Sequence, residues 1–316
     1  MADITFAEPP YHQDSGGDII LLSSDDVAFC VSKFILSLAS PFFETMFKLP
    51  QPKDQADEGS SPGANTVHFQ EDQRALYLIL RTSYPGRSPK LSDISDLHLA
   101  LRLDNKYGID ALRGMAEDAL NAMLHSDPVG VYALASCYQL DEFVERSAKF
   151  ARKLQLDDLY SDELSSIDAK QYHALISYHR RCSVAACGVG EFSWRWLGER
   201  TSIGTIFAPT PVWVHFKTCG CYPVDSTYKL LTHEGPEYKG THWWRRYIDL
   251  SKAALKTWPC GDAVIDEKLL SRVLADAREC EKCKRNINDD PDCLKVFSVK
   301  FAAEIERVVA EVSFAP

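Results

Sequence analysis

Apolar residues form short continuous runs near the N-terminus and follow helical spacing over most of the rest of the chain. Two apolar runs, 18–22 and 28–31, flank the turn-forming sequence SSDD and predict a β-hairpin. A third apolar run, NTVHF at 65–69, predicts another strand. The stretch 50–65, which precedes this third strand, is rich in Pro, Gly, Ser and charged residues, so it predicts a long exposed loop.

The segment FILSLASPFFETMF, residues 34–47, is strongly apolar but is interrupted at Ser40 and Pro41. A serine can cap the N-terminus of a helix, and proline is well suited to the first helical position because it has no N–H to leave unbonded. The segment therefore predicts two short helices, 34–39 and 41–49, rather than one continuous buried element.

Helical spacing then dominates the sequence. Leu76, Ile79, Leu80 and Tyr84 lie on one face of a predicted helix, and two further helices break near Gly108. Strands followed by helices indicate an α+β domain that ends near residue 124.

Beyond residue 124 the pattern predicts a helical continuation to about residue 190, with Asp127 and Pro128 as a cap and helix start. Residues 191–316 are expected to form a mixed α/β region. Its predicted elements are a strand at 211–219 and helices at 243–258, 266–283 and 294–312.

The composition and charge of the chain argue against two classes of protein, those that bind nucleic acid directly and those that span a membrane. The formal charge of −10 and the lack of a basic block disfavour direct binding to nucleic acid. No apolar run is long enough for a membrane helix, and the N-terminus lacks the features of a signal peptide. We therefore expect an intracellular protein without a membrane span, in which the ten cysteines are reduced thiols or metal ligands.

The first 124 residues resemble the BTB/POZ domain. The family pattern places an Asp at the start of a strand, followed at fixed offsets by a charged residue, Leu, Ser and aromatic residues. Its usual histidine is replaced here by Ser32, and LSLASPFFETMFKLPQP is most similar to a large group of fungal BTB proteins. The motif residues in this chain are Asp18, Lys33, Leu36, Ser40, Phe42, Phe43, Met46 and Phe47.

The resemblance implies a β-hairpin and a short sheet covered by helices at residues 17–124, after a flexible N-terminus at 1–16. It also implies a non-enzymatic adaptor or scaffold that binds other proteins through the BTB domain, as a homo-oligomer or as a cullin-3 ubiquitin ligase adaptor. The N-terminal residues lack the apolar stripe of a swapped-dimer helix, and the loop after Phe47 lacks the hydrophobic-x-Glu motif that strengthens cullin binding.

Two interpretations of the motif residues stay open. Asp18 and Lys33 form either a local structural pair or part of a groove that recognises a partner peptide, as in a transcription-linked regulator. Phe42, Phe43, Met46 and Phe47 are expected to anchor the domain core, with one or two of them left for a partner surface.

The cysteines of the C-terminal region are candidate ligands for a structural zinc ion, since zinc takes four thiolate or imidazole ligands and often uses closely spaced pairs. The alternative is that these cysteines are small core residues. No nucleophile elbow, phosphate-binding loop or HExxH motif is present, so we expect no enzyme activity and no cofactor other than zinc. The candidate ligands are His179, Cys182, Cys219, Cys221, Cys280, Cys283 and Cys293.

Overall fold

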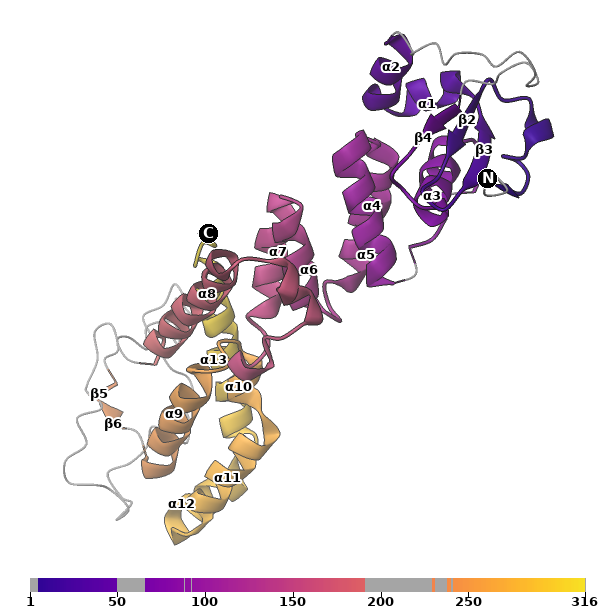
Figure 1. The fold of residues 1–316 in the computed structure, drawn as a ribbon. Coiled ribbons are helices and arrows are strands. Elements are labelled where there is room, and N and C mark those ends of the chain that lie inside the picture. The colour runs from indigo at the N-terminus through magenta and orange to yellow at the C-terminus, as the bar shows by residue number, and fades with distance from the viewer. Residues whose placement is uncertain are drawn as a thin grey trace, which may run out of the picture. The chain divides into compact units, whose positions relative to one another are not determined.

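The computed structural model describes residues 5–49, 66–87, 89–91, 93–190, 229–230, 238–239 and 241–315 (Figure 1). The chain divides into two compact units, Met1–Ser126 and Asp127–Pro316. Unit 1 combines a small sheet with helices, as predicted for an α+β domain. The described part of unit 2 consists mainly of helices, together with a pairing of two short strands.

The sheet of unit 1 has the strand order β1-β3-β2-β4. The predicted hairpin is confirmed: β2 and β3 are antiparallel, with Ile19 opposite Val31 and Leu22 opposite Ala28. Strands β1 and β4 flank this hairpin and run parallel to their neighbours. The bounds are β1 (Thr5–Phe6), β2 (Ile19–Leu22), β3 (Val27–Val31) and β4 (Thr66–His68).

The N-terminal residues differ from the flexible lead-in that the sequence suggested. Strand β1 pairs with β3 of its own chain, and a 3-10 helix, η1 (Gln13–Ser15), follows it. Tyr11 is 1% exposed, and its ring lies edge-on to that of Tyr84 at 5.3 Å. A single large aromatic side chain can hold a short segment in place without any apolar stripe.

The two helices predicted around Ser40 are confirmed as α1 (Lys33–Ala39) and α2 (Pro41–Lys48). The Ser40 hydroxyl accepts a hydrogen bond from the backbone N–H of Phe43 and donates one to the carbonyl of Tyr107, at 2.5 Å. The hinge between the helices is therefore held at its own cap and by a distant helix.

Three longer helices complete unit 1: α3 (Gln73–Ser83), α4 (Ile94–Tyr107) and α5 (Asp110–Met123). Gly108 ends α4 with a φ of 63°, the left-handed conformation that glycine adopts without strain. The buried side chains of the sheet and of α1 to α5 form one hydrophobic core, which includes Leu21, Phe29, Phe43 and Ile79.

Unit 2 begins with the predicted cap, because the Asp127 carboxylate accepts a hydrogen bond from the N–H of Gly130. Its first helices are α6 (Pro128–Cys137), α7 (Asp141–Ala151) and α8 (Ala169–Gly188), with the 3-10 helices η2 (Leu156–Asp158) and η3 (Asp162–Ser166) before α8. Strands β5 (Lys229–Leu230) and β6 (Tyr238–Lys239) pair antiparallel. The helices described in residues 241–315 are α9 (His242–Leu255), α10 (Asp262–Ile265), α11 (Glu267–Arg278), α12 (Glu281–Asp289) and α13 (Cys293–Ala310).

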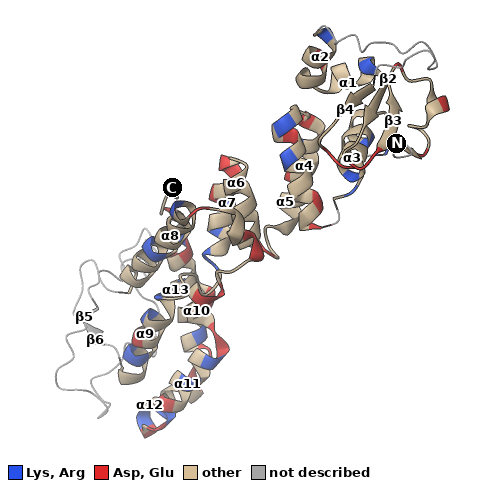
Figure 2. Ribbon diagram, viewed as in Figure 1, with Lys and Arg blue, Asp and Glu red and all other residues tan. Residues whose placement is uncertain are grey.

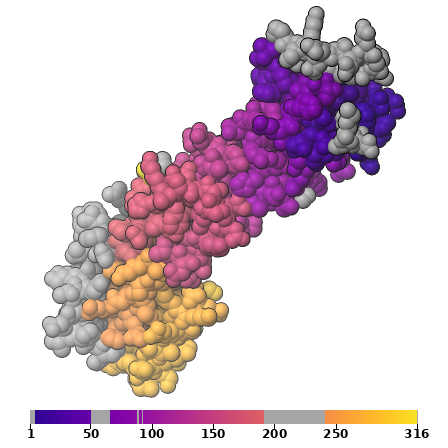
Figure 3. Space-filling view, in the orientation of Figure 1, coloured from indigo at the N-terminus to yellow at the C-terminus, as the bar shows by residue number. Residues whose placement is uncertain are grey.

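The helices of residues 127–190 and those of residues 241–315 share one hydrophobic core, although the sequence suggested two separate regions. Tyr178, Trp244 and Phe301 belong to this core, and in the space-filling view of Figure 3 the surfaces of the two stretches lie directly against each other. Arg152, with its side chain 8% exposed, forms an ion pair with Glu306 at 2.7 Å. Helix periodicity identifies apolar faces but not their partners, which is why the sequence separated the two regions.

Two sequence predictions for unit 2 differ in their outcome. The segment 266–283, predicted as one helix, is split into α11 and α12 at Glu279 and Cys280. The strand predicted at 211–219 lies outside the described residues. None of the helices in the described part of the chain is long and apolar enough to cross a membrane.

Candidate functional site

Asp18 and Lys33, the charged pair of the sequence motif, meet through the backbone. The Asp18 carboxylate accepts a hydrogen bond from the N–H of Lys33, the first residue of α1, at 2.7 Å. A carboxylate at a helix N-terminus satisfies an otherwise unbonded amide and interacts favourably with the helix dipole. The contact fixes α1 to the start of β2, and this geometry favours the structural interpretation of the pair.

The other motif residues sort into buried and partly buried positions. Leu36, Ser40 and Phe43 are 0% exposed. The ring of Phe43 stacks on that of Tyr107 at 5.6 Å and on that of Phe47 at 6.0 Å. Met46 and Phe47 pack against the same core while remaining partly accessible. These side chains therefore hold α2 against the domain.

Four other side chains, three on α1 and α2 and one at the C-cap of α2, are exposed and apolar, and we call them the apolar face of α1 and α2. Their exposed fractions are 74% for Phe34, 79% for Leu38, 41% for Phe42 and 60% for Leu49. Phe34 and Leu38 lie one turn apart on the same side of α1. The sequence motif contained only Phe42 of this set.

Helical geometry supplies the signal that would have found Phe34 and Leu38. Each lies two residues from the buried Leu36, which places it about 200° around the helix axis from that core position. A short helix that is apolar on both sides must either be buried on both sides or expose one of them. The choice depends on whether another element covers the helix, which local sequence does not record.

Charged side chains are sparse on this pair of helices. Lys33 is the one charged residue of α1, and α2 adds Glu44 and Lys48, which form an ion pair with each other at 2.5 Å. Figure 2 shows α1 largely in the colour of uncharged residues. A partner with apolar side chains therefore fits this surface better than a strongly charged one.

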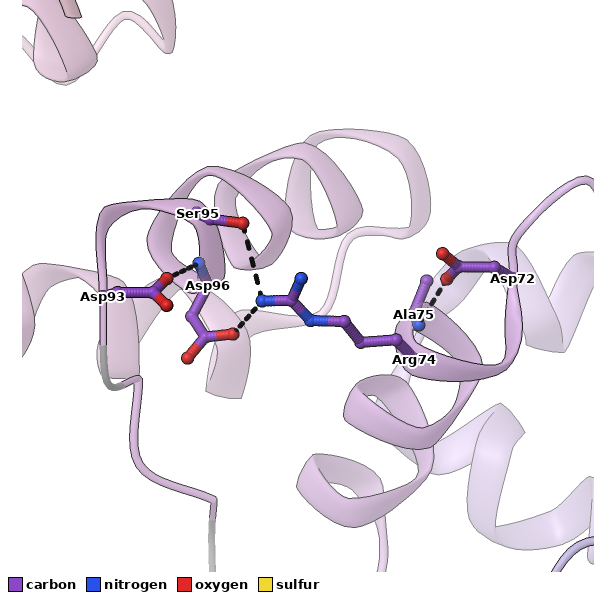
Figure 4. A network of polar contacts seen from close by, with 6 residues as sticks. All are labelled: Asp72, Arg74, Ala75, Asp93, Ser95 and Asp96. Carbon is purple, nitrogen blue, oxygen red and sulfur yellow. Dashed lines mark hydrogen bonds and ion pairs between the residues drawn. The ribbon is translucent and has the colours of Figure 1, made fainter. Parts of the chain in front are cut away.

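A polar network between α3 and α4 is a second surface feature of unit 1 (Figure 4). Asp72 and Asp93 cap the two helices by accepting hydrogen bonds from the N–H groups of Ala75 and Asp96, at 2.9 and 2.8 Å. The guanidinium of Arg74 reaches across to the Asp96 carboxylate. Since every carboxylate named here already has a hydrogen-bond or ion-pair partner within the chain, this network ties the two helices together.

Burial and hydrogen bonds shift the pKa values of two titratable groups beside the core of unit 1. The Glu71 side chain is 7% exposed and pairs with the ammonium of Lys106 at 2.5 Å. Burial alone would raise the pKa of Glu71, but the hydrogen bonds from Lys106 and Tyr107 outweigh it and the pKa is lowered. Burial raises the pKa of the Tyr107 phenol, which keeps it neutral.

In the part of the chain that the structure describes, candidate zinc ligands meet at most in pairs: the thiols of Cys280 and Cys283 are within hydrogen-bonding reach of each other. No group of three or more His, Cys, Asp or Glu side chains lies there in an arrangement that could hold a metal ion. His179 and Cys182 lie on α8 in the core of unit 2, whereas Cys283 and Cys293 are buried on α12 and α13. Cys219 and Cys221 lie outside the described residues, so the zinc hypothesis stays a prediction.

His179 already has a partner within the protein. Its imidazole Nε2 lies 3.2 Å from the carbonyl oxygen of Leu154, and the side chain is 1% exposed. Burial lowers the pKa of His179, so the neutral form is favoured. The arrangement is that of a core histidine.

The comparisons with known proteins agree with the fold of unit 1. The BTB/POZ domain family model matches residues 10–124, which include β2 to β4 and α1 to α5. The match ends at the residue where the sequence pattern placed the domain end and begins seven residues before the predicted start at 17. No curated protein matches the chain.

Proposed function

Because residues 10–124 form a BTB/POZ domain, a type of domain that generally mediates protein–protein interaction, we propose that this chain is a non-enzymatic interaction scaffold. Its apolar face of α1 and α2 binds a partner protein. The observation that carries this proposal is the exposure of Phe34 and Leu38, one helical turn apart, on a surface with few charges.

Two exposed large apolar residues on the same side of a short helix are well placed for association. Burying a Phe or Leu side chain contributes about 1.5–3 kcal/mol. Aromatic anchors near the centre of an interface also carry a large share of binding energy. The neighbouring residues Leu36, Ser40 and Phe43 hold the two helices in the domain core, so the exposed side chains are presented on a fixed backbone.

The occupant that these observations favour is a different protein with complementary apolar side chains. The N-terminal strand β1 pairs with β3 of its own chain, so this strand has a partner without a second copy. Association of two copies through the same face is the competing outcome, and it is distinguished by measuring the oligomeric state.

Leu38→Glu tests the proposal. The carboxylate opposes burial of this position, so captured partners should bind about tenfold or more weakly, which corresponds to at least about 1.4 kcal/mol. Val184→Glu is the matched control, because Val184 is 75% exposed on α8 of unit 2. The measurement is quantitative affinity purification with mass spectrometry of the intact chain and both variants.

The expected result is a set of proteins lost with Leu38→Glu and retained with Val184→Glu. A loss of dimer in Leu38→Glu, seen by light scattering, would assign the face to self-association. Identical capture by all three chains, with a folded Leu38→Glu variant, would show that the apolar face does not bind partners.

Cullin-3 is a narrower candidate partner, suggested by the resemblance to BTB proteins that act as ligase adaptors. A pull-down with purified cullin-3 tests it directly. Failure of the folded wild-type chain to bind cullin-3 at micromolar concentration would remove the ligase-adaptor role and leave the general scaffold function intact.

A further inference from the structure

Helix α13 has a buried side that fixes it in the core of unit 2. The ring of Phe297 lies edge-on to that of Trp244, with centroids 5.7 Å apart, and the ring of Phe301 lies edge-on to that of Tyr247 at 6.3 Å. Both phenylalanines are buried. Because tight aromatic packing holds this side, the opposite side of the helix is presented on a fixed backbone.

The opposite side of α13 is apolar and exposed. Val296 is 57% exposed, Val299 is 55% exposed, and Ala303 is exposed as well. These three positions follow steps of three and four residues, so they lie along one side of the helix over about two turns. Together with Lys295 and Lys300, which lie beside the valines in the sequence, we call them the valine patch.

The stability of the helix itself does not account for the two exposed valines. Valine is a poorer helix former than lysine or glutamate, because its branched side chain loses rotamer freedom in a helix. An exposed valine also leaves apolar surface in contact with water, and burial against a partner removes that contact. Two such residues one turn apart therefore indicate a surface for association.

The valine patch is positively charged. Residues 295–303 hold Lys295 and Lys300 but no acidic residue, and the acidic residue before them, Asp292, is the N-cap of the helix. Neither of these two ammonium groups forms an ion pair or a hydrogen bond with the part of the chain that the structure describes. Other lysines of the chain do pair with glutamates, at 2.5–2.6 Å: Lys48, Lys106 and Lys149.

The glutamates at the C-terminal end of α13 already have partners. Glu304 accepts hydrogen bonds from the guanidinium of Arg307 through both oxygens, at 2.9 and 2.7 Å, and Glu311 accepts one from it at 2.6 Å. Glu306 pairs with Arg152 at 2.7 Å. The valine patch therefore keeps a local positive charge in a chain whose formal charge is −10.

We propose that the valine patch binds an acidic amphipathic helix of a different protein. Apolar side chains at three- and four-residue spacing in the partner cover Val296 and Val299, and carboxylates beside them pair with Lys295 and Lys300. A helix fits this surface because the patch is a strip along α13, and helices pack side by side through such strips. The patch belongs to unit 2, whereas the apolar face of α1 and α2 belongs to unit 1.

Two other occupants fit the valine patch less well. A second copy of the chain, docked through the same patch, would bring Lys295 and Lys300 of both copies into one interface with no carboxylate from either patch, and like charges oppose association. An anionic bilayer is disfavoured because the patch has no aromatic side chain for the headgroup region and the net charge of −10 repels anionic surfaces.

The experiment measures binding of a fluorescein-labelled synthetic peptide to the full chain by fluorescence anisotropy. The peptide has about 18 residues, enough to form a helix on binding, with leucine at helical spacing on one side and glutamate and alanine elsewhere. A control peptide has the same composition, with its leucines distributed around the helix. The wild-type chain should bind the first peptide about tenfold or more tightly than the control.

The charge of the patch is tested with the double variant Lys295→Glu, Lys300→Glu. It should bind the amphipathic peptide about tenfold or more weakly, because both attractive charges become repulsive. Lys90→Glu with Lys170→Glu is the matched control, since both lysines are exposed and neither lies on α13. This control changes the net charge by the same amount and should alter the affinity by less than about twofold.

The apolar part is tested with the double variant Val296→Ser, Val299→Ser, which leaves the net charge unchanged. Its affinity should also fall by about tenfold, because the partner leucines lose their contacts. Val184→Ser, at a 75% exposed position on α8, should bind as the wild type does. Far-UV circular dichroism checks that each variant folds.

Equal affinity of the wild-type chain and the folded lysine double variant would overturn the proposal, as would no binding by the wild type at about 1 mM. Binding to phosphatidylserine vesicles that depends on Lys295 and Lys300, without peptide binding, would replace the protein partner with a lipid surface. A dimer in light scattering that Val299→Glu dissociates would instead assign the patch to self-association.

Discussion

Ser40 combines a local role with a long-range one. Its hydroxyl oxygen caps α2 by accepting from Phe43, as the Ser-Pro sequence predicted. The same hydroxyl donates to the carbonyl of Tyr107, which lies 67 positions away in the sequence. The cap could be predicted because its partner is three residues away, but the second bond depends on how α4 packs.

Ser40→Ala should therefore cost more than the loss of an ordinary cap. Both the Phe43 amide and the buried Tyr107 carbonyl lose a partner, so we expect unit 1 to lose about 2 kcal/mol in free energy of unfolding. Urea denaturation measures the change. Thr45→Ala, an exposed position on the same helix, should shift stability by less than about 0.5 kcal/mol, and equal effects of both would contradict the role assigned to Ser40.

His179 should make the stability of unit 2 depend on pH. Because burial lowers the pKa of His179 in the folded protein, the unfolded chain binds more protons once the pH falls below about 6.5, the usual histidine value. Stability from this group is fully present above that pH and is lost as the pH falls toward the lower folded pKa, at no more than about 1.4 kcal/mol per pH unit.

Urea midpoints measured from pH 8 to pH 5 test this dependence. His179→Gln keeps a donor for the Leu154 carbonyl but does not titrate, so its stability should vary less with pH than that of the wild type. His173→Gln, an exposed position on the same helix, is the control and should follow the wild-type curve. Parallel curves for wild type and His179→Gln would show that His179 does not control this dependence.

At the scale of elements, Gly17 lies so close to β3 that a side chain does not fit at this position. The local sequence pattern does not show this steric limit. A Cβ added at Gly17 would lie 2.5 Å from the backbone nitrogen of Val31 and 2.7 Å from its carbonyl oxygen. Gly114, in the exposed face of α5, has nothing within 4 Å of an added Cβ. The two glycines therefore serve different purposes.

Alanine at these two positions should change stability in opposite directions. Gly17→Ala forces the start of β2 away from β3 and should destabilise unit 1 by about 1–3 kcal/mol. Gly114→Ala should stabilise it by about 0.5–1 kcal/mol, because alanine restricts the unfolded chain and favours the helix. Thermal or urea unfolding measures both, and destabilisation by Gly114→Ala would show that α5 needs the glycine.

At the scale of the whole molecule, the two units have separate hydrophobic cores. The core of unit 1 includes Phe29, Phe43 and Ile79, and that of unit 2 includes Tyr178, Trp244 and Phe301. The BTB/POZ match lies entirely within unit 1. The proposed binding by the apolar face of α1 and α2 therefore concerns unit 1 alone.

Separation of the chain after Ser126 should leave two folded parts. Each should unfold cooperatively, at the midpoint that the same unit shows in the intact chain, since each keeps its complete core. Circular dichroism during heating measures this. A second part, 127–316, that lacks a cooperative transition would show that unit 2 needs unit 1 to fold.

The sequence by itself determined the hairpin, the helix starts at Ser40 and Asp127, and the helix end at Gly108. These features depend on side chains a few residues apart, and the BTB resemblance depends on the same local pattern. It also identified Cys280 and Cys283 as a closely spaced pair, because only two residues separate them in the sequence.

Only the tertiary structure decided which apolar side of α1 is covered, leaving Phe34 and Leu38 exposed. It also decided that residues 127–190 and 241–315 share a core and that His179 is bonded within the protein rather than gathered into a described metal cluster. The physical reason is the same in each case. Burial depends on contacts between residues far apart in the sequence. Apolar periodicity identifies the apolar face of a helix but does not identify the element that packs against that face.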